Sequence, residues 1–167
     1  MPDSQDRWAA IRRTYLSLGT GELAAAGTFV ALALVQTVLL QAPPLALWSA
    51  FAPLLVILVQ AGAYWLAARS WVGRGTMPKP LAGWYAAFRW LDPLLLAAGL
   101  VGLLVGWPDH PLTRILVIGA WGLGLIEYVN YYVVRLSYPI RVWWSRISSW
   151  RTPRLIRDIR AARAHAS

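Results

Sequence analysis

The stretch LAAAGTFVALALVQTVLLQA, residues 23–42, decides the fold of this chain. Its side chains are almost all apolar, and Gln36 is the only strongly polar residue before Gln41. A helix needs about 20 predominantly apolar residues to cross a bilayer, and this run has that length. Basic residues precede it, as in a signal peptide, but the apolar part of a signal peptide is shorter. The run therefore predicts a transmembrane helix at about 22–42.

Three further apolar runs predict helices at about 45–69, 84–106 and 114–138. The hydrocarbon core holds no water to satisfy open backbone groups, so segments at that depth must be helices. Pro53 is expected to kink the second helix. The predicted fold class is all-α: a polytopic membrane protein with four transmembrane helices, arranged as two antiparallel hairpins.

The composition agrees with one membrane domain, residues 1–139, followed by a tail, residues 140–167. Of the 167 residues, 58 % are hydrophobic and 14 % are charged, whereas soluble domains have about a quarter charged. There is no cysteine, which excludes disulfides, thiolate metal sites and cysteine catalysis. The predominance of Arg over Lys, with abundant Ala, Leu, Val and Trp, is typical of a high-GC bacterial genome.

Basic residues gather on one side of the four-helix arrangement. They lie in the N-terminal arm, in the loop between the second and third helices, and in the tail, whereas the other two loops hold only Arg114. The positive-inside rule puts the basic side in the cytoplasm. An odd number of crossings would split these clusters, so the sequence predicts a multi-pass protein of the inner cell membrane with both termini in the cytoplasm. The clusters are Arg7, Arg12 and Arg13; Arg69, Arg74 and Lys79; and Arg141, Arg146, Arg151, Arg154, Arg157, Arg160 and Arg163.

The tail combines this charge with an apolar stripe. Leu155, Ile156 and Ile159 follow Pro153 at helical spacing, with arginines between them. Such a pattern is typical of a helix that lies in the headgroup layer. Anionic lipids attract each nearby arginine by about 1 kcal/mol. The sequence therefore predicts a C-terminal amphipathic interfacial helix that binds anionic lipids, with a solvated basic tail as the alternative. The same pattern occurs earlier in the tail, at Ile140, Trp143, Trp144 and Ile147.

Two segments of the chain resemble each other. Residues 58–71 align with residues 125–138 without gaps, and Leu58/Leu125, Tyr64/Tyr131 and Ser70/Ser137 are identical pairs. A true repeat would relate two helical hairpins by an axis along the membrane normal. The alternative is that the inner ends of membrane helices commonly carry aromatic residues and arginine.

Polar side chains cluster in the inner halves of the helices. Glu127, Asn130 and Tyr131 share one face of the fourth helix by the i, i+3, i+4 rule, and Gln60 and Tyr64 share a face of the second. Polar groups are costly in hydrocarbon and mark functional sites. We predict a polar pocket that is open to the cytoplasm and formed by Gln60, Tyr64, Arg89, Asp92, Glu127, Asn130, Tyr131 and Arg135.

Two acids in this set have a structural interpretation as well. Glu127 is the deepest acid and should be protonated or paired with Arg89, either as a buried structural pair or as part of a functional site. Asp92 before Pro93 is typical of a helix N-cap with Pro at the first helical position. Residues 81–91 are then a kinked first part or an interfacial helix, and the alternative for Asp92 is ligand binding at a broken helix.

The outer halves of the last two helices are rich in small residues, which let helices approach closely. We therefore expect a tightly packed outer half opposite the inner pocket. These residues are Ala98, Gly102 and Gly106 in the third helix and Gly119, Gly122 and Gly124 in the fourth.

Two classes of function remain open. The first is a non-enzymatic membrane protein: an accessory or assembly subunit, with a membrane protein or a second copy as partner, or a small carrier whose pocket binds a polar or cationic ligand. The second is a membrane-embedded enzyme in which Arg89 and Arg135 bind a lipid headgroup phosphate while Glu127 or Asp92 acts as base. No catalytic, phosphate-binding or metal motif is recognisable, which favours the first class. We therefore assign no catalytic residue, metal or cofactor and expect no nucleic-acid partner.

Overall fold

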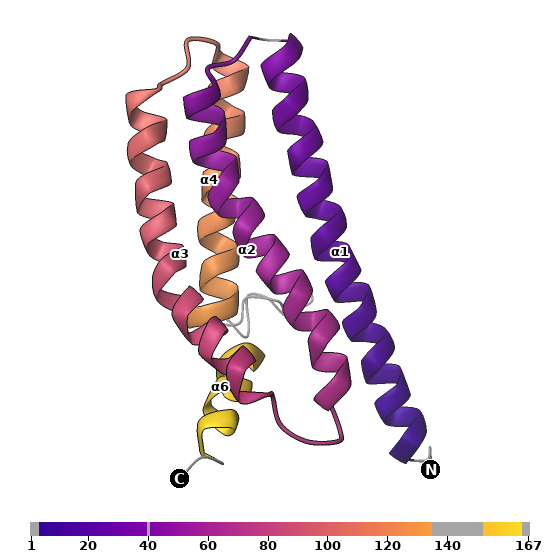
Figure 1. Ribbon diagram of the computed structural model, residues 1–167. Coiled ribbons are helices and arrows are strands. Elements are labelled where there is room, and N and C mark those ends of the chain that lie inside the picture. The colour runs from indigo at the N-terminus through magenta and orange to yellow at the C-terminus, as the bar shows by residue number, and fades with distance from the viewer. Residues whose placement is uncertain (1–3, 40, 135–151, 165–167) are drawn as a thin grey trace, which may run out of the picture.

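The computed structural model describes residues 4–39, 41–134 and 152–164. These parts of the chain are helical apart from short connections, and they contain no strand. The helices are α1 (Ser4–Leu39), α2 (Pro44–Trp71), α3 (Lys79–Val105), α4 (Pro111–Tyr128), the π-helix η1 (Val129–Val133) and α6 (Arg154–Ala164). Four of them, α1 to α4, are long and apolar enough to cross a membrane (Figure 1). The prediction of an all-helical chain with four such helices is confirmed.

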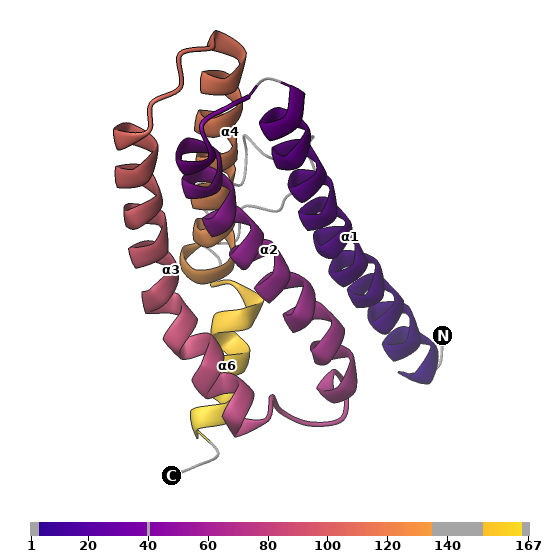
Figure 2. The same cartoon turned by 45° about the horizontal axis from the view of Figure 1, so that its top comes forward.

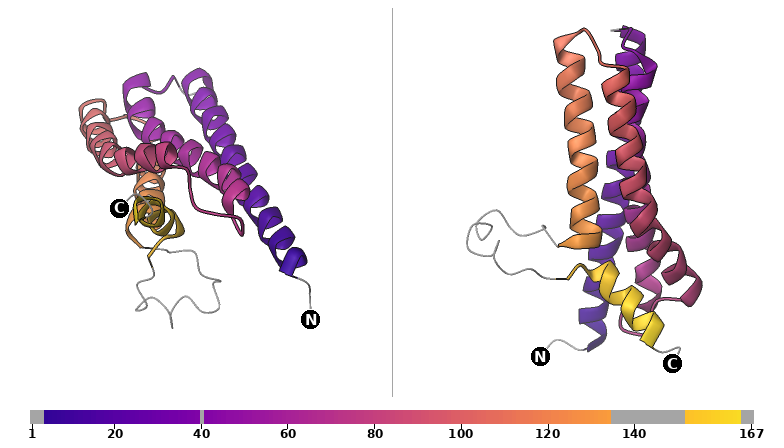
Figure 3. Two further views of the ribbon diagram at one scale, coloured as in Figure 1. Left: turned by 60° about the horizontal axis from the view of Figure 1, so that its bottom comes forward. Right: turned by 90° about the vertical axis from the view of Figure 1, so that its left-hand side faces the viewer.

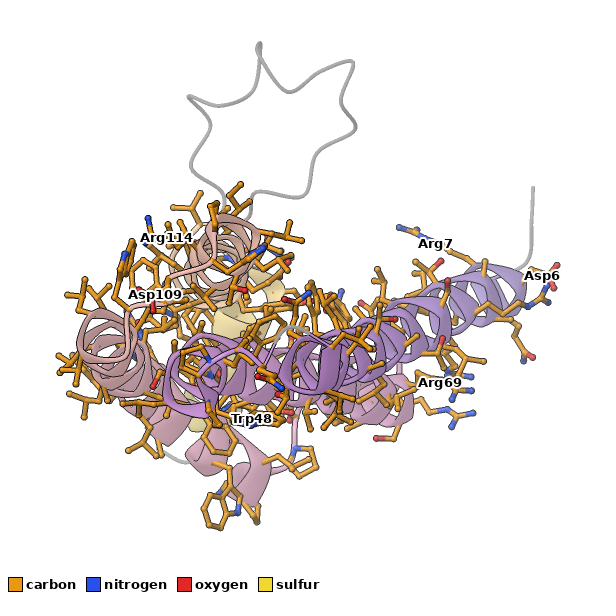
Figure 4. All side chains as sticks on the ribbon, turned by 90° about the horizontal axis from the view of Figure 1, so that it is seen from above. Asp6, Arg7, Trp48, Arg69, Asp109 and Arg114 are labelled. Atoms are coloured by element: carbon orange, nitrogen blue, oxygen red, sulfur yellow. The ribbon has the colours of Figure 1, made fainter. Side chains whose placement is uncertain are left out.

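The two chain ends lie at the same end of the bundle. We call this the terminal end; it also holds the loop at 72–78 and α6 (Figure 1). The connections at 41–43 and 106–110 form the opposite end. Seen from that opposite end, Asp109 and Arg114 lie over α3 and α4, whereas Asp6 and Arg7 lie far out along α1 (Figure 4).

The central helix of the bundle is α2. It lies along α1 on one side and contacts α3 and α4 on the other (Figure 2). Its Leu47, Phe51 and Leu54 are at most 1 % exposed. Phe51 also meets Phe29 of α1 edge-on, with 6.2 Å between ring centroids. The close packing of these side chains with those of α1, α3 and α4 therefore holds the three helices to one common helix.

The first helix begins much earlier than predicted. No proline interrupts residues 4–22, so the N-terminal arm continues the predicted membrane helix. Trp8 packs on Gly73, whose positive φ of 73° favours glycine and whose missing side chain makes room for the indole. Arg12 donates a hydrogen bond to the carbonyl of Val72 at 3.4 Å. These contacts tie the start of α1 to the loop after α2.

Glycines of α3 pack directly on the backbone of α2. Pro53 has no N–H, so the carbonyl of Ser49 loses its helical partner. Gly99 lies against this carbonyl, and Gly102 lies against the Ser49 hydroxyl. Gly106 and Gly124 also contact α2, as predicted for close packing. The same prediction is wrong for Gly119 and Gly122, because nothing lies within 4 Å of a Cβ placed there, and for Ala98, which is exposed.

The prediction that Asp92 caps a new helix is wrong. Helix α3 runs unbroken through Pro93 and bends in its lower part (Figure 1), as in the kinked alternative. Pro93 cannot donate to the carbonyl of Arg89. The hydroxyl of Tyr128 in α4 donates to that carbonyl instead, at 3.0 Å. A neighbouring helix therefore supplies the bond that proline removes, which allows the helix to continue.

Replacing Tyr128 with phenylalanine is expected to lower the stability of the bundle by about 1 kcal/mol, because the Arg89 carbonyl loses its donor. The melting temperature of the purified protein in detergent measures this loss. Trp90→Phe is the control, since Trp90 is 73 % exposed. Equal melting temperatures for the two variants would contradict the role given to Tyr128.

The tail helix α6 corrects a second prediction. Its apolar face does not lie on lipid: Leu155, Ile156, Ile159 and Ala162 are each at most 6 % exposed and pack on side chains of α2, α3 and η1. The helix lies beneath the end of α4 (Figure 3, right). An amphipathic pattern needs an apolar partner, and here the terminal end of the bundle supplies it. The pattern at 140–147 and the end of the repeat at 135–138 lie outside the described residues, and the repeat stays a prediction.

Candidate functional site

A cavity of about 400 Å³ lies at the terminal end of the bundle. This is within the range of small-molecule pockets, about 300–1,000 Å³. α1, α2, the junction of α4 with η1, and the start of α6 each form part of its wall. The lining residues are Ile11, Thr14, Tyr15, Leu18, Glu22, Tyr64, Trp65, Glu127, Asn130, Tyr131, Pro153, Arg154, Leu155 and Arg157.

The depth of the cavity follows from helix geometry. Counted at about 1.5 Å per residue from the opposite end of the bundle, Glu22, Tyr64 and Glu127 lie roughly 26, 30 and 24 Å down their helices. The hydrocarbon core of a bilayer is about 30 Å thick. In a bilayer the cavity would therefore lie at the boundary between the hydrocarbon core and the headgroup region.

A chain of hydrogen bonds crosses one wall of the cavity. The indole Nε1–H of Trp65 donates to the hydroxyl of Tyr131 at 3.1 Å, and that hydroxyl donates to Oε1 of Glu22 at 2.5 Å. The three residues come from α2, η1 and α1. Their bonds fix the side chain of Glu22 at the cavity surface, where the Glu22 carboxylate can still accept a hydrogen bond from a ligand.

A second carboxylate lies close to the first. Glu127 hydrogen-bonds to Asn130 and interacts electrostatically with Glu22. Both acids are half-buried. Like charges repel, and the repulsion is stronger in a partly buried site than in water. The site therefore favours any group that reduces the negative charge between the two acids.

Aromatic rings form the floor around these acids. Trp65 lies 5.0 Å from Tyr15, 5.0 Å from Tyr64 and 6.5 Å from Tyr131, measured between ring centroids. Tyr64 is completely buried, and Tyr15 and Tyr131 are at most 7 % exposed. Ring faces are electron-rich, so such a cluster attracts cations as well as apolar groups.

The start of α6 contributes arginine side chains to the cavity wall. The guanidinium of Arg154 lies 3.8 Å from the carboxylate of Asp158 and 5.1 Å from the centroid of the Tyr15 ring. Asp158 also accepts hydrogen bonds from the Tyr64 hydroxyl at 2.9 Å and the Trp71 indole at 3.2 Å. Arg154 is thus held by the Asp158 carboxylate and the Tyr15 ring, and the carboxylate offsets most of its charge.

A buried polar network lies beside the cavity. The amide nitrogen of Gln60 donates to Oδ1 of Asp92 at 2.9 Å, and its amide oxygen accepts from Tyr132 at 3.3 Å. Tyr85 donates to the backbone carbonyl of Gln60 at 2.9 Å. Asp92 is 1 % exposed, and its Oδ2 has no hydrogen-bond partner among the described residues. The gap beside Gln60 and Tyr132 has no room for a water molecule, so this network holds the helices together and offers no space to a ligand.

The structure divides the eight residues of the predicted pocket into groups. Half of them lie together in the cavity, two form the buried network, and one, Arg89, is exposed on α3. Arg135 lies outside the described residues. The cavity holds Tyr64, Glu127, Asn130 and Tyr131, and the network holds Gln60 and Asp92.

The predicted pairing of Glu127 with Arg89 is wrong. Among the described residues the structure shows one ion pair, Arg154 with Asp158. Successive residues of a helix point about 100° apart. Tyr128 faces the Arg89 carbonyl on α3, so Glu127 faces α1 and Glu22 instead.

The sequence reasoning missed several residues of the cavity. Glu22 stands at the boundary of the predicted first span, and Trp65 is absent from the predicted pocket. Tyr15 lies before the predicted first span, and Arg154 lies in the predicted tail. Glu22 directly precedes an apolar run, and this position is the signal in the sequence that could have identified it as a site residue. Within the described residues no three His, Asp or Glu side chains are grouped so that they could hold a metal ion.

Comparison with known proteins adds no relative. No protein-family model, no curated protein and no solved structure matches this chain.

Proposed function

We propose that this chain is a bacterial inner-membrane protein that crosses the bilayer four times with both termini in the cytoplasm, and that it acts as a small non-enzymatic carrier. Its cavity takes up a polar or cationic ligand from the cytoplasmic side. The observation that carries the proposal is the cavity of about 400 Å³ at the terminal end. The described basic residues of the N-terminal arm, of the loop after α2 and of α6 lie at that same end, which the positive-inside rule assigns to the cytoplasm.

The arrangement of acids and arginines supports a binding role over catalysis. The alternative, a membrane-embedded enzyme acting on a lipid headgroup, needs Arg89 beside Glu127 or Asp92 so that both reach one substrate. Arg89 is exposed on α3, and Asp92 is closed off beside Gln60. The cavity instead offers two half-buried carboxylates and a surround of rings, which is a set of binding groups.

Thiol labelling tests the proposal, because the chain has no cysteine of its own. Asn130→Cys is expected to react with a membrane-impermeant maleimide in inverted membrane vesicles, which expose the cytoplasmic face. It should not react in right-side-out vesicles, because Asn130 lines a cavity at the terminal end.

Three further single cysteines serve as controls. Thr76→Cys, in the loop after α2, should react from the cytoplasmic face, and Asp109→Cys, in the loop after α3, should react from the outer face. Ala98→Cys is exposed on the side of α3 and should react from neither, since lipid covers it. If Asn130→Cys, like Ala98→Cys, reacted from neither face, the open pocket would be ruled out. If Thr76→Cys and Asp109→Cys reacted from the same face, the model of four crossings would be ruled out.

A further inference from the structure

The chemistry of the cavity selects a class of ligand. Two carboxylates, those of Glu22 and Glu127, share one half-buried site. Each is held by a neutral donor: Tyr131 donates to Glu22, and Asn130 bonds to Glu127. Neither acid has a basic partner among the described residues. Half-buried acids without counter-charge are electrostatically costly, and a bound cation removes that cost.

The walls of the cavity add a second preference. Trp65 lies at the centre of a ring cluster with Tyr15, Tyr64 and Tyr131. Rings attract cations over their faces and bury apolar groups well, and aromatic enclosures are used by proteins to bind organic ammonium groups. A small hydrated metal ion would not fill about 400 Å³ or use these rings.

The arginines of α6 do not reverse this preference. Arg154 pairs with Asp158, whose carboxylate offsets its positive charge, and its guanidinium lies over the Tyr15 ring. Arg157 is exposed to solvent at the edge of the cavity, where screening by water and salt weakens its field. The negative charge of the two glutamates therefore dominates the interior.

We propose that the cavity binds an organic cation with an apolar or aromatic body, held by Glu22 and Glu127 and enclosed by the rings around Trp65. This inference rests on the proposed carrier function and names its ligand class. The cationic centre lies between the two carboxylates, and the apolar body lies on the aromatic floor. Tyr131 positions Glu22 for this contact through its hydrogen bond.

A pair of probes with the same shape and opposite charge tests the ligand class. Tetraphenylphosphonium is expected to bind the purified full-length protein in a non-ionic detergent with a stoichiometry of one, measured by calorimetric titration. Tetraphenylborate should show no saturable binding. Glu22→Gln and Glu127→Gln should each weaken phosphonium binding by about tenfold, which equals about 1.4 kcal/mol.

Matched variants separate a lost charge from a lost fold. Asp109→Asn removes an acid from the loop at 106–110, outside the cavity, and should leave binding unchanged. Glu22→Asp keeps the charge and should weaken binding less than Glu22→Gln. Melting temperatures of all variants show whether each is folded, and Glu22→Gln alone suffices if Glu127→Gln does not fold. Binding of tetraphenylborate at least as tight as that of the phosphonium, or Gln variants that bind like the parent, would overturn the cation assignment.

The failure of this inference differs from the failure of the carrier proposal. If Asn130→Cys is labelled from the cytoplasmic face but tetraphenylphosphonium neither binds nor slows the labelling, the pocket stands and the cation class falls. If Asn130→Cys is unreactive from either face, the carrier proposal itself falls. Retarded labelling in the presence of the phosphonium, and not of the borate, is the expected result.

Discussion

Gly99→Leu is expected to prevent the bundle from forming a stable folded state. Gly99 lies against the backbone carbonyl of Ser49 and the ring of Pro53 in α2, with no room for a Cβ. A leucine there cannot be accommodated by a rotamer change, because the nearest atom belongs to the backbone. Overpacking typically costs about 1–3 kcal/mol and occasionally more, and this backbone contact places Gly99→Leu at the upper end or beyond. Size-exclusion profiles and melting temperatures in detergent measure the loss.

Gly119→Leu is the matched control for that experiment. Gly119 lies on α4, in the same half of the bundle, and a Cβ at this position meets nothing within 4 Å. The same substitution on a membrane helix should therefore leave the melting temperature nearly unchanged. If Gly119→Leu lowered the melting temperature as much as Gly99→Leu, the face of α4 at Gly119 would have to be packed against a surface outside this chain. If both were tolerated, the close contact between α2 and α3 would be contradicted.

The two glycines also show what the sequence can and cannot predict. Hydropathy and length predicted four membrane helices, because burying backbone in lipid leaves a chain little alternative to long apolar helices. Small residues predicted close packing in the outer half. Which of them face a neighbour depends on how each helix is rotated about its axis, and the apolar faces of these helices look alike in the sequence. Gly99 was therefore missed, while Gly119 was wrongly included.

The misinterpretation of Asp92 has a different physical origin. The Asp-Pro pair is a local signal for a helix start, and local signals can be overridden by a neighbouring helix. Tyr128 supplies the hydrogen bond to the Arg89 carbonyl that Pro93 cannot supply, and Gln60 takes up Asp92. Both partners lie more than 30 residues away in the chain, so a local pattern could not reveal them.

The candidate site was predictable only where one helix carries several of its residues. Glu127, Asn130 and Tyr131 share a face of one helix, and all three line the cavity. Glu22 stands at the very start of the predicted span, and Tyr15 comes from the part of α1 that extends beyond it. That extension depends on contacts such as Trp8 with Gly73. The helix α6 was recognised as amphipathic, but amphipathicity does not reveal whether lipid or protein covers the apolar face.

Asp158→Ala is expected to release α6 from the bundle. The carboxylate accepts hydrogen bonds from Tyr64 and Trp71. Both donor side chains are buried, Tyr64 completely, so removing the acceptor leaves two donors without a partner. Unsatisfied buried donors cost about 1–3 kcal/mol each. The ion pair with Arg154, which is one-third exposed, adds little. The undocking of α6 should therefore become easier by about 2–6 kcal/mol.

Hydrogen–deuterium exchange detected by mass spectrometry locates this loss. Amides of 155–162 should exchange much faster in Asp158→Ala, whereas peptides of α2 and α4 should keep their protection. Arg160→Ala is the control on the same helix, since Arg160 is exposed, and it should change little. Unaltered exchange in α6 of the Asp158→Ala protein would show that apolar contacts alone hold the helix.

Release of α6 has a consequence for the cavity, which makes the prediction more specific. Pro153, Arg154 and Leu155 form part of the cavity wall, so the wall moves away when the helix undocks. In Asp158→Ala, a cysteine at position 130 should then react faster with maleimide from the cytoplasmic face, because α6 no longer covers part of the cavity. The probe that needs an enclosed site, tetraphenylphosphonium, should bind more weakly although Glu22 and Glu127 are unchanged. Faster labelling together with weaker binding requires α6 to be part of the enclosure, whereas faster labelling with unaltered binding would place the ligand on α1, α2 and α4 alone.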